Sequence, residues 1–185
     1  MAVKSSFKNM TLCLLAICLV CSSLLAGVYA LTKEPIAVAE KAKNDAAIKE
    51  VLPEEPAIVL EGTTEDGHEY LVAMKADSTV VGYVVNVAPN GFGGPIKMKV
   101  GFNAEGLVWN VKVLSHAETP GLGAKCTEPA FSSQFQKLDP NTTSLKVTKE
   151  GGSINAITAS TITSRAYASG VEEAVDVYHK IKVEE

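Results

Sequence analysis

The chain has 185 residues, 46% of them hydrophobic and 6% aromatic, and its formal net charge at pH 7 is −4. This length suits one domain of ordinary size with an additional segment, and the apolar content is sufficient for a buried core. The acidic balance and the lack of a basic patch interleaved with aromatic residues argue against a nucleic-acid partner.

An uncharged segment near the N-terminus, residues 10–31, is long enough to cross a membrane. Because ~20 helical residues span a hydrocarbon core of about 30 Å, we predict a transmembrane helix here. Lys4 and Lys8 precede it, which favours a cytoplasmic N-terminus over residues 1–9. A cleaved signal peptide is the alternative, since Val28-Tyr29-Ala30 is an acceptable cleavage signal.

A segment rich in Ala, Lys and Glu, residues 36–52, favours a helix that continues from the membrane or lies just outside it. Pro35 predicts a break or a kink near the membrane surface, and Pro53 and Pro56 predict the end of the helix. Residues 32–56 are therefore expected to form a helical stalk, and residues 57–185 an extracytoplasmic domain.

The first half of that domain is rich in β-branched residues and in alternating patterns, separated by glycine-containing turn signals such as Asp66-Gly67 and Glu105-Gly106. The expected strands cover residues 57–60, 69–75, 80–87, 96–102 and 107–114. An antiparallel meander is the simplest chain path through them.

Three further elements are expected: a short helix over 128–136, a short strand over 145–149 and a long final helix over 163–182. Apolar residues recur in the final helix at intervals of four and three. Its predicted buried face consists of Tyr167, Val171, Ala174, Tyr178 and Ile181. The predicted fold class is therefore α+β, with an N-terminal transmembrane helix followed by an antiparallel sheet packed with helices.

Several residues that often form sites are assigned no such role. Tyr83, Trp109 and Tyr167 fall within strand or helix patterns and are expected in the core. Cys126 is the only cysteine of the expected extracytoplasmic part, and a lone cysteine is more often structural than reactive. The three histidines are far apart in sequence, and no zinc or iron–sulfur spacing occurs, so we expect no metal site.

Residues 155–161, Asn-Ala-Ile-Thr-Ala-Ser-Thr, place small residues and hydroxyls just before a helix start. Free amide N–H groups and the positive end of the helix dipole favour a bound phosphate there, and a hydroxyl so placed is suited to carry a phosphate ester. The alternative is an ordinary helix start, in which Thr163 or Ser164 caps the helix.

The segment resembles the motif Asp-x-x-(Ser/Thr)-Gly-Ala-Thr, in which the last threonine carries FMN through a phosphoester. This motif belongs to the FMN-binding domain shared by the G subunit of the Rnf complex and the C subunit of the sodium-translocating NADH:quinone reductase. Thr161 matches the modified threonine. Asn155, Ala159 and Ser160 depart from the motif: Asn155 loses a charge, Ser160 adds a second hydroxyl, and Ala159 would be strained if the backbone needs a positive φ there.

Two other segments strengthen the resemblance. Residues 116–125 contain a stiff Thr-Pro-Gly-x-Gly turn that alone reads as structural, but beside the Thr161 motif it resembles the flavin-contacting loop of the same family. Residues 91–96 resemble the family's glycine-rich hairpin. The resemblance implies that Glu118, Thr119, Leu122 and Gly123 line the isoalloxazine ring, and that Thr158, Ser160 and Thr161 surround its phosphate.

The resemblance implies an electron-relay subunit that carries one covalent FMN and no catalytic residue of its own. It would belong to an oxidoreductase complex that couples electron transfer between ferredoxin and NAD to translocation of sodium ions or protons. The expected partners are a multi-helix flavin subunit, membrane iron–sulfur subunits and a flavin transferase for maturation. The chain would cross the bacterial inner membrane once, with its C-terminal domain on the periplasmic side. Alternatives are the quinone-reductase C subunit, a flavin-free scaffold subunit, or a soluble secreted flavoprotein if the N-terminus is cleaved.

Overall fold

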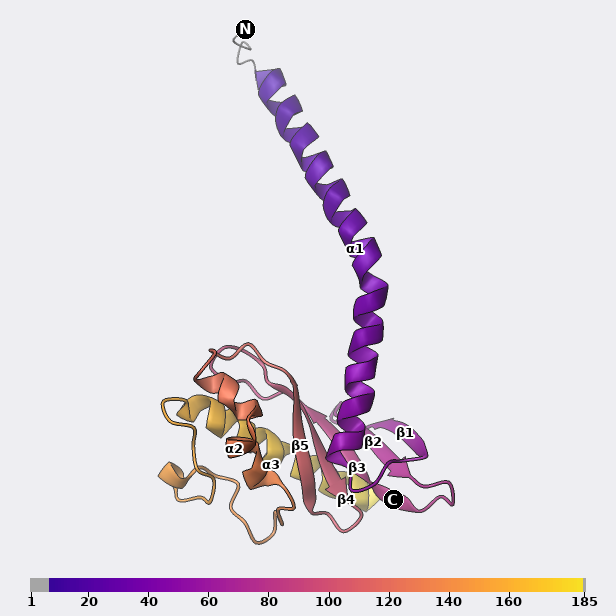
Figure 1. Ribbon diagram of the computed structural model, residues 1–185, viewed down its shortest axis with the longest axis vertical. Helices are drawn as coiled ribbons and strands as arrows, with labels where there is room; N and C mark the ends of the chain where they lie inside the picture. The colour runs from indigo at the N-terminus through magenta and orange to yellow at the C-terminus, as the bar shows by residue number, and fades with distance from the viewer. Residues whose placement is uncertain (1–6, 185) are drawn as a thin grey trace. The chain divides into compact units, whose positions relative to one another are not determined.

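The structure is a computed structural model that describes residues 7–184. The chain divides into two compact units, Met1–Lys43 and Asn44–Glu185. Helix α1 (Phe7–Val51), the indigo to purple ribbon in Figure 1, begins in the first unit and ends in the second. The second unit carries the sheet and the other helices.

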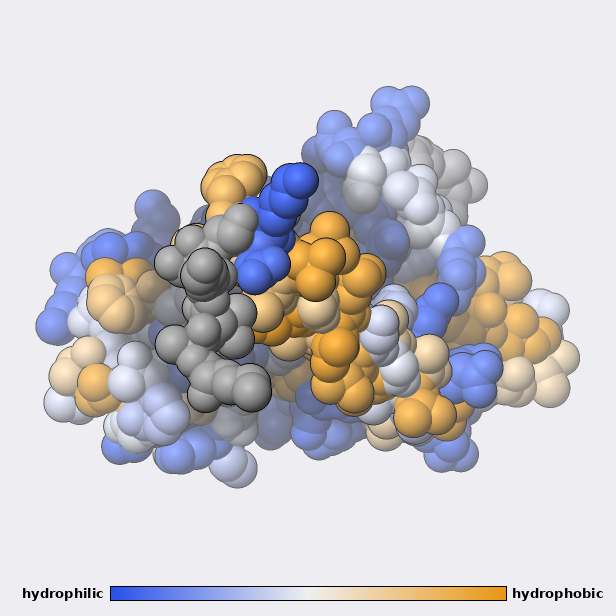
Figure 2. Space-filling model, turned by 90° about the horizontal axis from the view of Figure 1, so that it is seen from above, coloured by the Kyte–Doolittle hydropathy of each residue, from blue (hydrophilic) through white to orange (hydrophobic). Residues whose placement is uncertain are grey.

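The part of α1 in the first unit has the length and composition of a membrane-spanning helix. Its large apolar side chains are exposed, among them Leu12, Leu19 and Leu25. Figure 2, which looks down on the molecule from above, shows hydrophobic residues gathered over this helix. An apolar surface of this extent is stable where hydrocarbon rather than water surrounds it.

Pro35 lies inside α1, which continues without interruption from Phe7 to Val51. A proline within a helix removes one backbone hydrogen bond and costs about 3 kcal/mol, but a long helix can accommodate it as a bend. Here an apolar segment precedes Pro35 and a run of strong helix formers follows it. Of the predicted break or kink at Pro35, the break is therefore wrong and the kink stays a prediction. The predicted helix end before Pro53 is confirmed.

Five strands form one sheet, in which each strand pairs antiparallel with the next in sequence. They are β1 (Ile58–Thr63), β2 (Glu69–Met74), β3 (Val80–Val87), β4 (Lys97–Asn103) and β5 (Val108–Ser115). Gly67 and Gly106 turn the chain between strands with φ of 84° and 90°, values that a glycine adopts without strain. The predicted antiparallel meander is confirmed.

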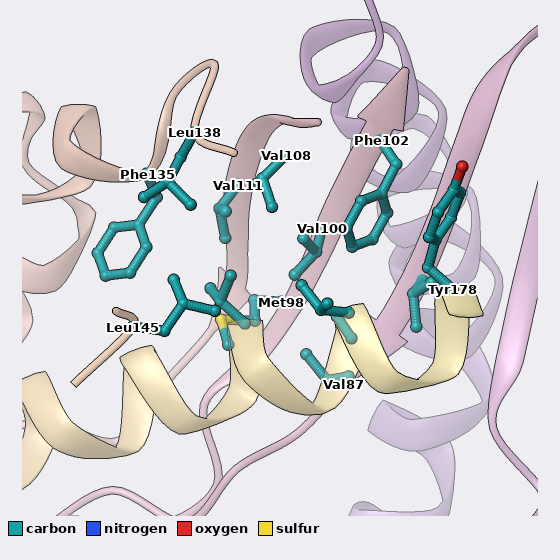
Figure 3. Packing of buried hydrophobic residues seen from close by; sticks show 14 of the residues in the cluster. Val87, Met98, Val100, Phe102, Val108, Val111, Phe135, Leu138, Leu145 and Tyr178 are labelled. Carbon is teal, nitrogen blue, oxygen red and sulfur yellow. The ribbon is translucent and has the colours of Figure 1, made fainter. Parts of the chain in front are cut away.

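One face of the sheet packs against α3 (Thr161–Glu184), as Figure 3 shows. Met98, Val100 and Phe102 point from β4 toward this helix, and the Tyr178 ring stacks on Phe102 with 4.9 Å between centroids. All five residues of the predicted helix face are buried. Of the other residues expected to be structural, Tyr83 and Cys126 are buried, whereas Trp109 is only half-buried. This layer contains most of the hydrophobic core, so the α+β fold class is confirmed.

The other face of the sheet packs against the last turns of α1. Val51 and the following Leu52 are almost fully buried there, in a second cluster that includes Leu71 and Val84, and Ala47 is buried as well. The contact is close, because a Cβ at Gly101 would lie 2.0 Å from the Val51 carbonyl oxygen. The end of α1 is therefore part of the domain core.

Short helical turns connect β5 to α3. They are η1 (Gly123–Thr127), α2 (Pro129–Ser132), η2 (Ser133–Phe135) and η3 (Thr148–Glu150). The expected helix over 128–136 is thus present, with its second half tightened into a 3₁₀ turn. The expected strand over 145–149 is wrong: Val147 forms one isolated bridge with Ile154, while Leu138 takes the place beside β5. A β-branched run forms a strand only where a sheet edge is open to it.

Candidate functional site

Residues 155–161, the acceptor segment in which Thr161 is the predicted attachment point, lead directly into α3, which begins at Thr161, two residues earlier than predicted. A turn precedes it, in which the Ser160 amide donates to the Ile157 carbonyl at 3.0 Å. The Ser164 hydroxyl donates to the Ser160 carbonyl and accepts from the Ile157 amide, each at 2.9 Å. Ser164 therefore closes the turn from inside the helix, so that Thr161 is the first helical residue.

Ala159 adopts a left-handed conformation, with φ of 60°. This is the position at which the resembled motif has glycine, so the condition for strain at Ala159 is met. A residue with a Cβ in this conformation costs about 1–2 kcal/mol relative to a right-handed one. The acceptor segment thus holds local backbone strain two residues before Thr161.

Gln134 fixes the other end of the acceptor segment. Its Oε1 accepts from the Asn155 amide at 2.8 Å, and its Nε2 donates to the Asn155 carbonyl at 3.2 Å. The side-chain amide thus pairs with the backbone as a neighbouring strand would. No local pattern in the sequence points to Gln134, since the contact crosses 21 residues.

A cleft of about 400 Å³ lies beside the N-terminus of α3. It is lined by Phe92, by Glu118, Thr119, Leu122 and Gly123, and by residues 159–163. The three segments singled out in the sequence thus meet at one place. Of the expected site residues, only Thr158 is outside the lining, and it is exposed. Phe92, which sequence reasoning missed as a single residue, belongs to the glycine-rich hairpin.

The floor of the cleft consists of four buried residues, Glu118, Gly123, Ser160 and Thr163. The Glu118 carboxylate accepts from the Gly93 amide through Oε1 at 2.9 Å and from the Thr163 hydroxyl through Oε2 at 2.5 Å. These bonds join the hairpin, the loop after β5 and the first turn of α3. The floor is therefore held rigidly by residues distant in sequence.

The rim of the cleft consists of three exposed apolar side chains. Phe92 is 71% exposed, Ile162 51% and Leu122 42%. Thr161 lies among them, half-buried. Apolar walls around a few fixed polar groups are typical of sites for small molecules and cofactors.

Cys126 lies in η1, three residues after Gly123, and is fully buried. Burial raises the pKa of its thiol to about 11, and the negative charge of Glu118 contributes in the same direction. The high pKa makes the thiolate scarce at neutral pH, which agrees with the expected structural role.

The chain is similar to known proteins over most of its length. Residues 91–176 match the family described as FMN-binding domain, and residues 1–51 match the family described as RnfG N-terminal region. The G subunit of an ion-translocating oxidoreductase complex from Methanosarcina acetivorans is 35% identical over 165 aligned positions, covering 85% of this chain and 86% of that protein. Its counterpart from Shewanella piezotolerans is 32% identical over 197 aligned positions, covering 97% and 92%.

A likeness to a solved structure is weaker. The C subunit of the Na(+)-translocating NADH-quinone reductase from Parabacteroides distasonis is 22% identical, with a TM-score of 0.48 and 61% of each chain covered.

Proposed function

This chain belongs to the family of G subunits of ion-translocating oxidoreductase complexes, and on that premise we propose that it transfers electrons through an FMN esterified to Thr161. The match to the FMN-binding domain family spans every segment that lines the cleft. The observation that carries the proposal is the position of Thr161, a half-buried hydroxyl at the first residue of α3 that opens into this cleft.

The N-terminus of α3 suits a phosphate. The N–H groups of residues 161–163 have no acceptor among residues 7–184, as expected for the first turn of a helix. These amides and the helix dipole favour an anion. An ester to Thr161 would hold the phosphate at these donors.

The remainder of the cleft suits a flat aromatic ring. Its volume of about 400 Å³ lies within the range of ~300–1,000 Å³ that is usual for small-molecule sites. Phe92, Leu122 and Ile162 offer apolar contact area around the opening. Bound FMN would supply the electron-transfer chemistry, while these side chains orient its ring and exclude water.

The membrane-spanning helix supports the remaining expectations. We propose that α1 anchors the chain in the bacterial inner membrane, with Asn44–Glu185 on the periplasmic side. The chain would work with the membrane subunits of the complex, because α1 alone offers no ion pathway. A flavin transferase would be needed to form the ester.

A flavin-free scaffold subunit is the second candidate, and Ala159 is the observation that favours it. The left-handed backbone at this position is strained by a Cβ that the resembled motif lacks. If that strain or the loss of the motif's aspartate at Asn155 prevents modification, the fold would persist without the cofactor.

Mass spectrometry tests the proposal. The full chain is produced in cells that make the flavin transferase, and the tryptic peptide from Glu150 to Arg165 is fragmented. We expect an FMN-phosphoryl adduct on Thr161 that Thr161→Val abolishes and the neighbouring control Ser160→Ala retains. An unmodified wild-type peptide would support the scaffold, and an adduct on Ser160 would refute the assignment of Thr161.

A further inference from the structure

Glu118 places a carboxylate in the cleft floor with no cation beside it. Glu118 is 5% exposed, and no lysine, arginine or histidine in the described part of the chain lies within 4.0 Å of its carboxylate oxygens. Burying a charge without a partner of opposite charge costs several kcal/mol. Two hydrogen bonds, from the Gly93 amide and the Thr163 hydroxyl, offset part of this cost.

Two glycines leave room for the Glu118 carboxylate. A Cβ at Gly91 would lie 2.3 Å from Glu118 Oε1, and a Cβ at Gly123 would lie 2.3 Å from Oε2. Neither glycine has a positive φ, so space rather than backbone conformation requires the absence of a side chain. The two glycines therefore form close walls around the carboxylate.

The hydrogen bonds alone do not require a charge. A glutamine at position 118 could accept from the Gly93 amide through its oxygen and donate to the Thr163 hydroxyl through its nitrogen. The hydrogen bonds that join the three segments would then form without the cost of a buried charge. These hydrogen bonds therefore explain the position of the Glu118 side chain but not its charge.

The charge acts on its surroundings. It contributes to the raised pKa of the Cys126 thiol, and the Glu118 side chain also lines the cleft itself. Electrostatic interactions are stronger where water is excluded, so a group bound in the cleft experiences this charge more strongly than it would experience a charge on the surface.

We propose that the negative charge of Glu118 lowers the reduction potential of the flavin held in the cleft. The inference rests on the proposed function, since it requires bound FMN. The ring becomes more electron-rich when it accepts electrons from a neighbouring redox group, and a nearby carboxylate disfavours that reduced form. The hydrogen bond from the Thr163 hydroxyl stabilises the negative charge on the carboxylate, so it weakens the effect of that charge on the flavin.

Potentiometric titration of the purified, flavin-loaded full chain tests this role, with dithionite as reductant, redox mediators and flavin absorbance as the readout. Glu118→Gln should shift the midpoint potential of the flavin that it carries to a more positive value. The control is Glu128→Gln, because Glu128 is exposed, lies outside the cleft lining and makes no side-chain cap. This variant should have the wild-type midpoint.

Thr163→Val provides a test of opposite sign. It removes the hydroxyl donor and leaves the charge less compensated, so the midpoint should become more negative, while Thr163→Ser should restore the wild-type value. In the double variant with Glu118→Gln, the effect of Thr163→Val should disappear, because the charge on which it acts is absent. A purely structural role would produce neither the opposite signs nor this dependence.

Three results would overturn the role of Glu118. The first is an unchanged midpoint in flavin-loaded Glu118→Gln, and the second is a shift of the same sign in both single variants. The third is loss of flavin from both variants, which would place the pair in attachment instead. Mass spectrometry of the peptide that contains Thr161 separates these results from failure of the proposed function, because in that case the wild-type chain itself would carry no flavin.

Discussion

The floor of the cleft is made of buried polar groups joined by hydrogen bonds, whereas its rim is made of apolar side chains exposed to solvent. Glu118 and Thr163 in the floor are 5% and 1% exposed, and Phe92 in the rim is 71% exposed. The hydrogen bonds of the floor cross 25 and 45 residues of sequence. A hydrogen-bonded floor is fixed before any ligand binds, while exposed side chains remain free to adjust to one.

This difference predicts that the two parts respond differently to substitution. Changes in the floor should alter the stability of the whole domain, because they disturb contacts between distant segments. Changes in the rim should alter how the ligand is bound and shielded from solvent, and should leave folding intact. The four predictions below test this contrast, from the largest expected effect to the smallest.

Gly123→Ala should have the largest effect. The new Cβ would lie 2.3 Å from Glu118 Oε2 and 2.7 Å from Thr163 Oγ1, so it would displace the bond between them. We expect the free energy of unfolding to fall by about 2–4 kcal/mol, from overpacking and a poorly satisfied carboxylate. Chemical denaturation of the full chain in detergent measures this.

Gly121→Ala is the matched control in the same loop. Gly121 has φ of 77° and no atom within 4 Å of an added Cβ, so the substitution introduces backbone strain without a clash. Its cost should be about 1–2 kcal/mol. Equal losses in the two variants would contradict a tightly packed floor.

Stability at alkaline pH should report how well the domain excludes water from Cys126. The pKa of the Cys126 thiol is raised from 9.0 to about 11 in the folded chain. Because the folded state disfavours the thiolate, the stabilisation is complete below about pH 9 and is lost as the pH rises through 11. The loss amounts to about 2–3 kcal/mol.

Denaturation of wild type and Cys126→Ala at pH 8, 9, 10 and 11 isolates this contribution. Other groups titrate in both proteins, so the difference between the two curves belongs to the thiol. Parallel curves would mean that water reaches Cys126.

Ala159→Gly should stabilise the domain by about 1 kcal/mol, because glycine adopts the observed φ of 60° without strain. A higher unfolding temperature of the unmodified chain would show this. The exposed residue Thr158 supplies the control: Thr158→Gly adds backbone freedom without relieving a positive φ and should not stabilise. No gain at Ala159 would show that the acceptor segment relaxes around its Cβ.

Phe92→Ser should have the smallest effect on folding, within about 0.5 kcal/mol, since the ring is mostly exposed. In the flavin-loaded chain, the same change should raise the quenching of flavin fluorescence by iodide, because the flavin ring loses the Phe92 side chain that shields it from solvent. Unchanged quenching would remove Phe92 from the rim that contacts the flavin. Phe131→Ser, at a buried position, should instead destabilise the domain strongly.

Local patterns were sufficient to predict most of the fold. Alternation and glycine turns predicted the meander, and four-three spacing predicted the buried face of α3, because these patterns arise within each element. The strand over 145–149 failed, since pairing depends on a neighbour that sequence does not show. The start of α3 was misplaced by two residues, because Ser164 closes the preceding turn from within the helix.

The candidate site was less accessible to such reasoning. The resemblance brought Glu118 and Thr161 to the same region and raised the question of a positive φ at Ala159. The bonds of Glu118 to Gly93 and Thr163, and of Gln134 to Asn155, join residues at least 21 positions apart. Such contacts follow from tertiary packing, so neither periodicity nor spacing predicts them.

The close contact between Val51 and Gly101 has a practical consequence for proteolysis and for truncation of the chain. Ala47, Val51 and Leu52 contribute to the core although they precede the sheet, so a fragment that starts at Ala57 would expose Leu71 and Val84 to water. A fragment that starts at Asn44 would retain this cover. A protease that cuts just before Asn44 should therefore leave a stably folded domain, whereas one that cuts after Leu52 should leave a destabilised domain.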